Sequence, residues 1–251
     1  MFSHVFSKSC SARILQCTFS QSNTCRLAHL SCFWTIFLGH GPFSHLWERF
    51  VKTANPGLEW EHEHSSIRML DHLIEANALK PLLKELGNLD DQDILFIKEC
   101  ISGPLDPESG LPIKHFSPDA KEWPYRGRNE DKSFLYEIVA NKISGIDVDK
   151  FDYLKRDDYY MQIGTIFKFD RFINYSKIIK TGNPERRRIC IRDKEAELVM
   201  EMFSDRARMH KNGYQHRVTK IIDCMLVDAW LLADKHIQVL NWERAADINF
   251  S

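Results

Sequence analysis

The spacing of apolar residues near the C-terminal end restricts the fold of this chain more than any other feature of its sequence. Between Val218 and about Lys235 apolar residues recur every three or four positions, the period of one face of an α-helix. The members of this stripe are Val218, Ile221, Ile222, Met225, Leu226, Ala229 and Leu232. A helix over 193–210 carries a second stripe of Ala196, Val199, Met200, Phe203 and Ala207. Both stripes are predicted to pack in a hydrophobic core and not to bind a cofactor.

Further helices are predicted upstream of these two. The segment 65–86 begins with serine caps and places Ile67, Leu70, Leu73 and Ile74 on one face. Segments 90–101, 133–142 and 145–160 are also helical, and Asp147 is the expected N-cap of the last. The proline-rich segment 104–131 is predicted to be a long loop, and alternation over 188–192 predicts a strand. The expected fold class is therefore mostly α, with one or two short strands.

Overall composition excludes some classes of function. Apolar residues make up 43% of the 251 positions and the formal net charge is −1, as in a globular protein without overall affinity for nucleic acid. No apolar run approaches the ~20 residues of a membrane span. Four of the seven cysteines lie in the first 32 residues without CxxC spacing, which favours reduced, intracellular thiols over a zinc site or a disulfide framework.

Acidic residues are absent from the first part of the chain, where Glu48 is the first of 35. Residues 1–37 are rich in Ser, Cys and Thr and carry few basic residues. This composition is similar to that of an organellar presequence, but helical amphipathicity is poor. We therefore expect 1–37 to lie outside the fold, with a presequence as the alternative.

Two histidines flank a Gly-Pro turn in the stretch FLGHGPFSHLW. His40 and His45 in so short a loop suit binding of a metal or a phosphate, whereas two structurally satisfied loop histidines are the alternative. The spacing of this pair alone does not decide between them.

A polar row and a distal cluster suggest a nucleotide. Asp149, Tyr153 and Asp157 stand four residues apart, so that one helical face presents carboxylate, phenol and carboxylate. A solvated face with ion pairs is the alternative. Further on, Arg206 can grip a phosphate and Tyr214 can stack on a ring.

Six motifs in order carry a resemblance to a known family. They are LGHGPFSH, WEHEHSS, WPYRGR, KSFLYEIVANKISGIDVDKFDYLKRD, RICIRDKE and GYQHRV. The chain resembles the SAM-and-HD-domain-containing deoxynucleoside triphosphate triphosphohydrolases of animals, over roughly 38–237. The resemblance implies an all-α HD phosphohydrolase that splits a dNTP, such as dGTP, into deoxynucleoside and intact triphosphate with a bound Fe, Mn or Zn ion.

The resemblance also implies roles for individual residues. Asp149 matches a metal ligand, His62 matches a proton donor, and His45 is a catalytic candidate beside it. Substrate-binding positions match His40, Lys150, Tyr153, Asp157, Arg206, Tyr214 and Gln215. Among these, Lys150 and Arg206 match groups on the triphosphate. Tyr153 and Asp157 match groups that read the sugar, and Tyr214 and Gln215 match the end of the pocket that rejects a ribose 2′-hydroxyl.

Basic residues match the family's allosteric nucleotide sites, where GTP or a dNTP joins subunits into a tetramer. These residues are Arg171, Arg192, Lys194 and Arg217. Solvated arginines around a strand are the alternative. Because the N-terminal part of those sites has no match here, we expect weak GTP binding and no stable tetramer.

The family's metal ligands are incompletely matched. The family reads Cys-His-Asp-Leu-Gly-His where this chain reads Thr-Ile-Phe-Leu-Gly-His over 35–40, so a metal is expected to be poorly held. We expect 38–237 to be a partial HD domain and 238–251 a divergent tail. The expected function is dNTP triphosphohydrolysis with impaired turnover; the alternative is a catalytically silent nucleotide-binding or interaction module. Weak single-stranded nucleic-acid binding is a lesser possibility, and the expected location is nuclear or cytoplasmic.

Overall fold

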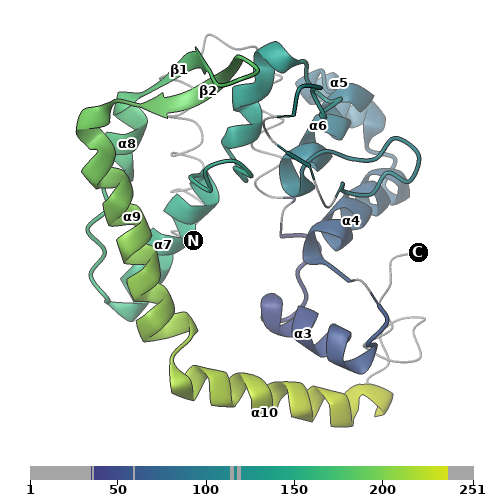
Figure 1. The fold of residues 1–251 in the computed structure, drawn as a ribbon. Coiled ribbons are helices and arrows are strands. Elements are labelled where there is room, and N and C mark those ends of the chain that lie inside the picture. Colours follow the sequence, from purple (N-terminus) through teal and green to yellow (C-terminus); the bar gives the residue numbers. More distant parts are fainter. Residues whose placement is uncertain (1–34, 36, 59, 114–115, 118–119, 237–251) are drawn as a thin grey trace.

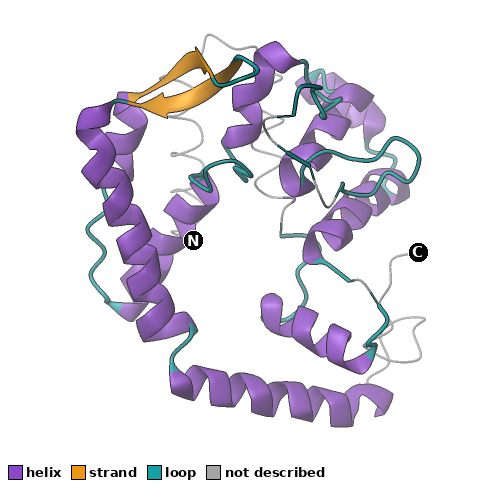
Figure 2. Ribbon diagram, in the orientation of Figure 1, coloured by secondary structure: helices purple, strands orange, loops and turns teal. Residues whose placement is uncertain are grey.

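Helices dominate the computed structural model of the chain (Figure 2). The structure describes residues 35, 37–58, 60–113, 116–117 and 120–236. Within these ranges, one antiparallel two-stranded sheet accompanies the helices. The predicted mostly α fold class is confirmed. The segments 1–34 and 237–251, which include most of the expected N-terminal segment and the expected tail, lie outside the described residues.

The described elements follow one another around a ring (Figure 1). The first helices are α3 (His45–Ala54), α4 (His62–Ala76), α5 (Lys80–Gly87) and α6 (Asp91–Ser102), followed by the 3-10 helix η1 (Glu130–Glu137). Next come α7 (Val148–Met161), α8 (Phe169–Tyr175), β1 (Ser176–Thr181), β2 (Arg186–Ile191) and the short η2 (Asp193–Glu195). The chain continues through α9 (Ala196–Met209), the π-helical turn η3 (His210–Tyr214), α10 (Arg217–Ala233) and η4 (Asp234–His236). In Figure 1, α10 runs from the end of α9 back to α3 and closes the ring.

Local capping explains where two of the predicted helices begin. The Asp90 carboxylate accepts the backbone N–H of Asp93, and the Asp93 side chain accepts the N–H of Asp90, a reciprocal capping box at the start of α6. Asp147 accepts the backbone N–H of Lys150 and caps α7, as predicted. These starts depend on neighbours within three residues, and for that reason they can be read from sequence.

The predicted helix 65–86 needs correction. It begins earlier, at His62, and is interrupted between α4 and α5, where Ala78 has a positive φ of 48°. Ser65 and Ser66 are not caps but buried residues inside α4. Ile67, Leu70 and Ile74 are buried as predicted, whereas Leu73 is exposed.

Two hydrophobic clusters hold the described residues together. The larger gathers side chains of α4, α6, η1, α7 and α9, with Phe96, Phe134 and Phe151 at its centre. The smaller joins Trp47 and Phe50 of α3 to Val227 of α10. The indole of Trp230 adds ring contacts of 5.7 Å to both aromatic residues of α3. The smaller cluster thus ties the end of the described chain back to its beginning.

The apolar stripes predicted for the last two long helices are largely outside the core. On α10, Ile221 is 59% exposed and Leu232 is 76% exposed, because α3 packs on the other face, where Val227 is 4% exposed. On α9 the buried positions are Leu198, Met202, Asp205 and Met209. The buried face was not predicted because the charged Asp205 interrupts its apolar pattern. The Asp205 carboxylate accepts hydrogen bonds from the backbone N–H groups of Ile166 and Phe167, both at 2.8 Å.

The remaining predictions were partly right. The predicted strand 188–192 is β2, and its partner β1 was not predicted. The predicted helix 133–142 is the 3-10 helix η1 over 130–137. Among the described residues, no helix has the length and apolarity needed to cross a membrane.

Candidate functional site

Two glycines shape the histidine loop before α3. A Cβ on Gly39 would lie 2.1 Å from the backbone N of Ser66, and one on Gly41 would lie 2.2 Å from the indole of Trp47. The Gly39 N–H also donates to the Ser66 hydroxyl at 3.0 Å. Because neither glycine has a side chain, the loop lies directly against α4 at Gly39 and against Trp47 of α3 at Gly41.

This packing brings three predicted histidines together. The imidazole centroids of His40 and His62 are 4.5 Å apart, those of His45 and His62 are 5.0 Å apart, and those of His40 and His45 are 6.4 Å apart. His45 is the first residue of α3 and not a loop residue, and His62 is the first residue of α4. The first residues of α3 and α4 and the loop that precedes α3 thus form one imidazole cluster.

Glu48 is a member of this cluster that the sequence did not reveal. Its Oε2 lies 3.0 Å from Nδ1 of His62 and 3.8 Å from Nδ1 of His45. Its Oε1 accepts a 2.6 Å hydrogen bond from Lys52. Burial opposes ionisation, but the hydrogen bonds from Lys52 and His62 hold the pKa of Glu48 below its usual value. The spacing His-x-x-Glu at 45–48, one turn of helix, was the available signal.

The ligand atoms of Asp149, the predicted metal ligand, do not converge with those of two further His, Cys, Asp or Glu side chains in the part of the chain that the structure describes. The ligand atoms that do converge among the described residues are those of His45, Glu48 and His62. Burial, followed by the charge of Asp147, raises the pKa of Asp149 to about 6. Because no group of three ligands that includes Asp149 forms among the described residues, the donors present do not fit the family's metal centre.

A second set of predicted residues meets between α7 and the end of α9. The Arg206 Nε donates to the Tyr153 hydroxyl at 3.2 Å, and the Tyr214 hydroxyl donates to Asp157 Oδ2 at 2.6 Å. The two phenol rings lie 6.3 Å apart. Segments more than fifty positions apart in sequence therefore present phenols, a guanidinium and a carboxylate in one place.

His210 belongs to the same place and was missed. Its ring lies 5.1 Å from that of Tyr214 at an interplanar angle of 79°. Burial and the nearby Arg206 lower the pKa of His210, which favours the neutral imidazole. Both residues lie on the π-helical turn η3, a feature often found at functional sites.

Two other predicted substrate residues lie at the edge of this set. The Lys150 ammonium is 3.1 Å from Asp147 Oδ2, so it pairs with the helix cap. Gln215 is exposed directly after Tyr214.

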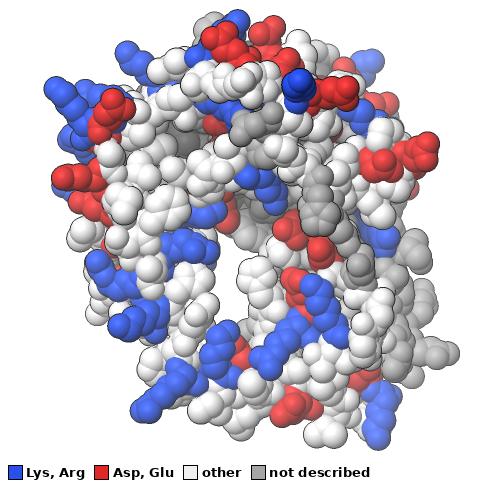
Figure 3. All heavy atoms as spheres, viewed as in Figure 1, with Lys and Arg blue, Asp and Glu red and all other residues white. Residues whose placement is uncertain are grey.

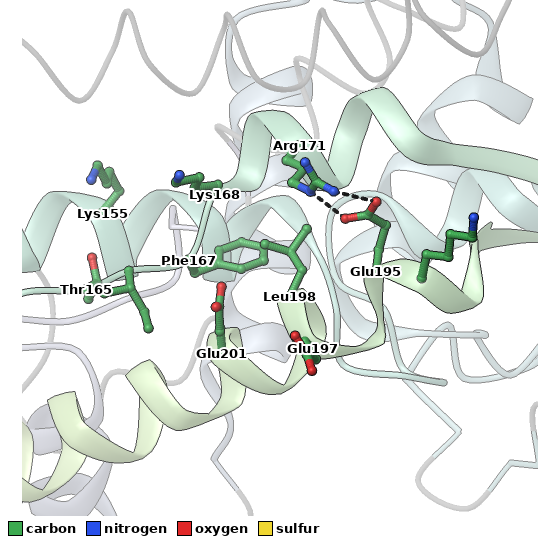
Figure 4. Close-up of a pocket in the computed structure, with 11 residues that line it drawn as sticks. Lys155, Thr165, Phe167, Lys168, Arg171, Glu195, Glu197, Leu198 and Glu201 are labelled. Carbon is green, nitrogen blue, oxygen red and sulfur yellow. Dashed lines mark hydrogen bonds and ion pairs between the residues drawn. The ribbon is translucent and has the colours of Figure 1, made fainter.

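Three of the four predicted allosteric residues lie together. Arg171 Nη2 and Arg192 Nη2 both donate to Oε1 of Glu195, at 2.8 and 2.6 Å, and Lys194 is adjacent in sequence. Arg171 and Lys194 line a cavity of about 700 Å³ between α7, α8 and the start of α9 (Figure 4). Lys155 and Lys168 also line this cavity. Arg217 is exposed at the start of α10 and is not among the lining residues.

The imidazole cluster and the α7–α9 set belong to different sides of the ring. Figure 1 shows α3 and α4 on one side and α7 with α9 on the other. The space-filling view shows an opening through the molecule between these sides, with Lys and Arg atoms on its rim (Figure 3).

Comparison with known proteins places this geometry in context. Over 203 residues, which are 80% of this chain, the sequence is 47% identical to the deoxynucleoside triphosphate triphosphohydrolase SAMHD1 of Bos taurus and covers 33% of that protein. It is 45% identical to SAMHD1 of Homo sapiens over the same share of this chain and 31% of that protein. It is 35% identical to the SAMHD1 homologue of Dictyostelium discoideum over 202 residues, which are 80% of this chain and 32% of that protein. No family model matches the chain.

The chain spans about a third of the length of the curated relatives it matches. The match is strongest among animal proteins and extends to an amoebal one. Over the matched residues, the chain is a partial relative of proteins named deoxynucleoside triphosphate triphosphohydrolase SAMHD1.

Proposed function

We propose that this chain binds deoxynucleoside triphosphates and serves their hydrolysis to deoxynucleoside and intact triphosphate. The observation that carries the proposal is the pair of contacts Arg206–Tyr153 and Tyr214–Asp157, which assemble a phosphate-binding group beside a sugar-binding group. The names of the relatives support the same substrate class.

Arg206 and Asp157 are proposed to bind different parts of the substrate. The guanidinium offers planar donors that suit a phosphate oxygen pair. The Asp157 carboxylate accepts from Tyr214 and from Arg156 Nη1 at 3.0 Å, and a sugar hydroxyl can donate to the same carboxylate. The Tyr214 ring restricts the space beside that hydroxyl, as expected of a site that selects a deoxyribose.

His62 is the proposed proton donor. Water attacks the α-phosphorus, the bond from phosphorus to the sugar O5′ breaks, and the departing oxygen takes a proton. Glu48 Oε2, 3.0 Å from Nδ1 of His62, stabilises the imidazolium and fixes the ring. His45 and His40 complete the cluster as proposed substrate-facing groups.

Turnover is proposed to be slow. In the family a divalent ion polarises the phosphate, and such an ion contributes several kcal/mol to a transition state, where each ~1.4 kcal/mol is tenfold in rate. Among the described residues, Asp149 belongs to no group of three converging ligands. That observation favours the alternative function, a silent nucleotide-binding module.

A product assay tests the proposal. The purified chain is incubated with dGTP and added Mn²⁺, and triphosphate, pyrophosphate and phosphate are separated. The expected result is slow release of intact triphosphate, which His62→Ala abolishes and His72→Ala, an exposed change on the same helix, leaves unaltered. Release of pyrophosphate or phosphate would contradict it, because a different bond breaks. Binding without any release supports the silent module.

Weak GTP binding at the Arg171 and Lys194 cavity, the absence of a stable tetramer, weak nucleic-acid binding and an intracellular location stay predictions. The cavity contains acidic as well as basic residues, which supports weak binding of an anion. The division of the chain at 37 and 237 is likewise our proposal.

A further inference from the structure

We propose that His45, Glu48 and His62 form a zinc site of this chain, separate from the family's metal centre at Asp149. The ligand atoms of these three side chains lie within 4.8 Å of one another. They come from the first turn of α3 and the first residue of α4. The inference rests on these three side chains and does not require dNTP hydrolysis.

The distances suit a tetrahedral ion. Zinc bonds to His nitrogen and carboxylate oxygen are about 2.0–2.2 Å long, so two ligand atoms of a tetrahedral site are about 3.3–3.5 Å apart. Glu48 Oε2 lies 3.0 Å from Nδ1 of His62 and 3.8 Å from Nδ1 of His45. Both of these separations are within a few tenths of an ångström of the required values.

The neighbouring carboxylate supplies the support that a ligating histidine needs. Nε2 of His62 lies 3.3 Å from Oε2 of Glu63, so the ring can hold its proton on Nε2 and offer an unprotonated Nδ1 to the metal. A carboxylate that accepts from the other ring nitrogen orients the imidazole and increases its basicity. Glu63 would therefore act on the metal through His62, as a positioning residue.

Glu48 is prepared for the same role. Lys52 binds Oε1 and leaves Oε2 directed at the two histidines. The nearby ammonium weakens attraction for a dication, which places the site among exchangeable ones.

The donor atoms favour zinc, and the exposed His45 side chain gives the ion access to the site. Two imidazoles and one carboxylate suit zinc better than manganese, which prefers oxygen ligands. The His45 side chain is 78% exposed, so the ion enters from solvent and its fourth position takes water. Because His62 cannot ligate zinc through Nδ1 and stay paired with Glu48, metal loading and the proton transfer proposed above exclude each other.

Metal titration tests the site directly. The full chain is stripped with a chelator, and Zn²⁺ is titrated against a chromogenic competitor, while Co²⁺ replaces zinc as a probe of geometry by its visible absorption. We expect one Zn²⁺ per chain, bound more tightly than Mn²⁺, and a tetrahedral Co²⁺ spectrum. His45→Ala, Glu48→Gln and His62→Ala each weaken binding at least tenfold, and Glu63→Gln weakens it about tenfold.

His72→Ala, an exposed histidine change on α4, is the matched control and retains the affinity. Far-UV circular dichroism confirms that the variants fold, and Glu63→Gln serves as the test where a ligand variant does not. Absence of zinc binding overturns the inference. Equal affinity of His62→Ala and His72→Ala overturns it as well, and loss of binding in Asp149→Asn with retention in Glu48→Gln places the ion at the other site. Because the readout is the metal, a failure here is distinguishable from a failure of dNTP hydrolysis.

Discussion

The hydroxyl of Tyr214 donates a 2.6 Å hydrogen bond to Oδ2 of Asp157 and so joins the π-helical turn after α9 to the middle of α7. Burial and this hydrogen bond to the carboxylate both raise the pKa of Tyr214, so the phenol stays protonated and acts as a donor. This hydrogen bond is a direct polar link between η3 and the polar row of α7.

Tyr214→Phe removes that link while keeping the ring. We expect the free energy of unfolding to fall by about 1 kcal/mol, since one hydrogen bond to a charged acceptor is lost, and dGTP affinity to fall several-fold. Chemical denaturation and equilibrium binding measure the two effects. Tyr160→Phe, on an exposed tyrosine of the same helix as Asp157, is the control, and equal losses in both variants would refute a specific role.

Gly39→Ala tests how the histidine loop is positioned. The added Cβ would meet the α4 backbone at Ser66 N, 2.1 Å away, and the loop must move outward with His40. We expect a destabilisation of about 1–3 kcal/mol, typical of overpacking. The matched control is Gly57→Ala, where nothing lies within 4 Å of an added Cβ. A Gly39→Ala protein as stable as Gly57→Ala would show that the loop does not lie on α4 in solution.

The exposed face of α10 gives a contrast between two substitutions. Ile221→Lys places a charge in water and should change the free energy of unfolding by less than about 0.5 kcal/mol. Val227→Ala removes methyl groups from the cluster with Trp47 and Phe50 and should cost about 1–3 kcal/mol. If Ile221→Lys proves the more damaging change, the stripe is covered in solution and the sequence prediction of a core face was right.

Glu137 should make stability depend on pH. Burial raises its pKa to about 7 from an unfolded value of 4.5, although the Ile189 N–H and Arg188 oppose this. The folded protein therefore holds a proton that the unfolded chain releases between these values, so the contribution of Glu137 to stability is greatest below pH 4.5 and is lost up to about pH 7. The loss is on the order of 3 kcal/mol. Unfolding measured across this range should show a flatter profile for Glu137→Gln; an unchanged slope would mean that another group titrates.

Sequence predicted those features that depend on near neighbours. The Asp147 cap of α7 follows from residues within one turn. The polar row of the same helix was visible because its side chains repeat every four residues. The helical positions of Tyr153 and Asp157 were therefore predictable, whereas only the family resemblance placed Arg206 and Tyr214 in one site with them.

Features that depend on distant packing were not predictable. Nothing in the α10 stripe indicates that α3 covers the face of Val227 and not that of Ile221. The buried Asp205 broke the apolar pattern of α9 because its carboxylate satisfies two backbone N–H groups about forty residues away. The 3.0 Å contact between Glu48 and His62 was not predictable, because it arises where α3 meets α4.

Equilibrium binding of dGTP to the wild-type chain and to Arg206→Ala tests most directly the claim that α7 and the end of α9 form the nucleotide site. Arg187→Ala, an exposed arginine change on β2, is the control for lost positive charge. The account predicts measurable dGTP binding that Arg206→Ala weakens by about tenfold or more, as expected for a charge-assisted contact with phosphate, and that Arg187→Ala leaves unchanged. Equal binding by the wild-type chain and Arg206→Ala, or no binding by the wild-type chain, would contradict it.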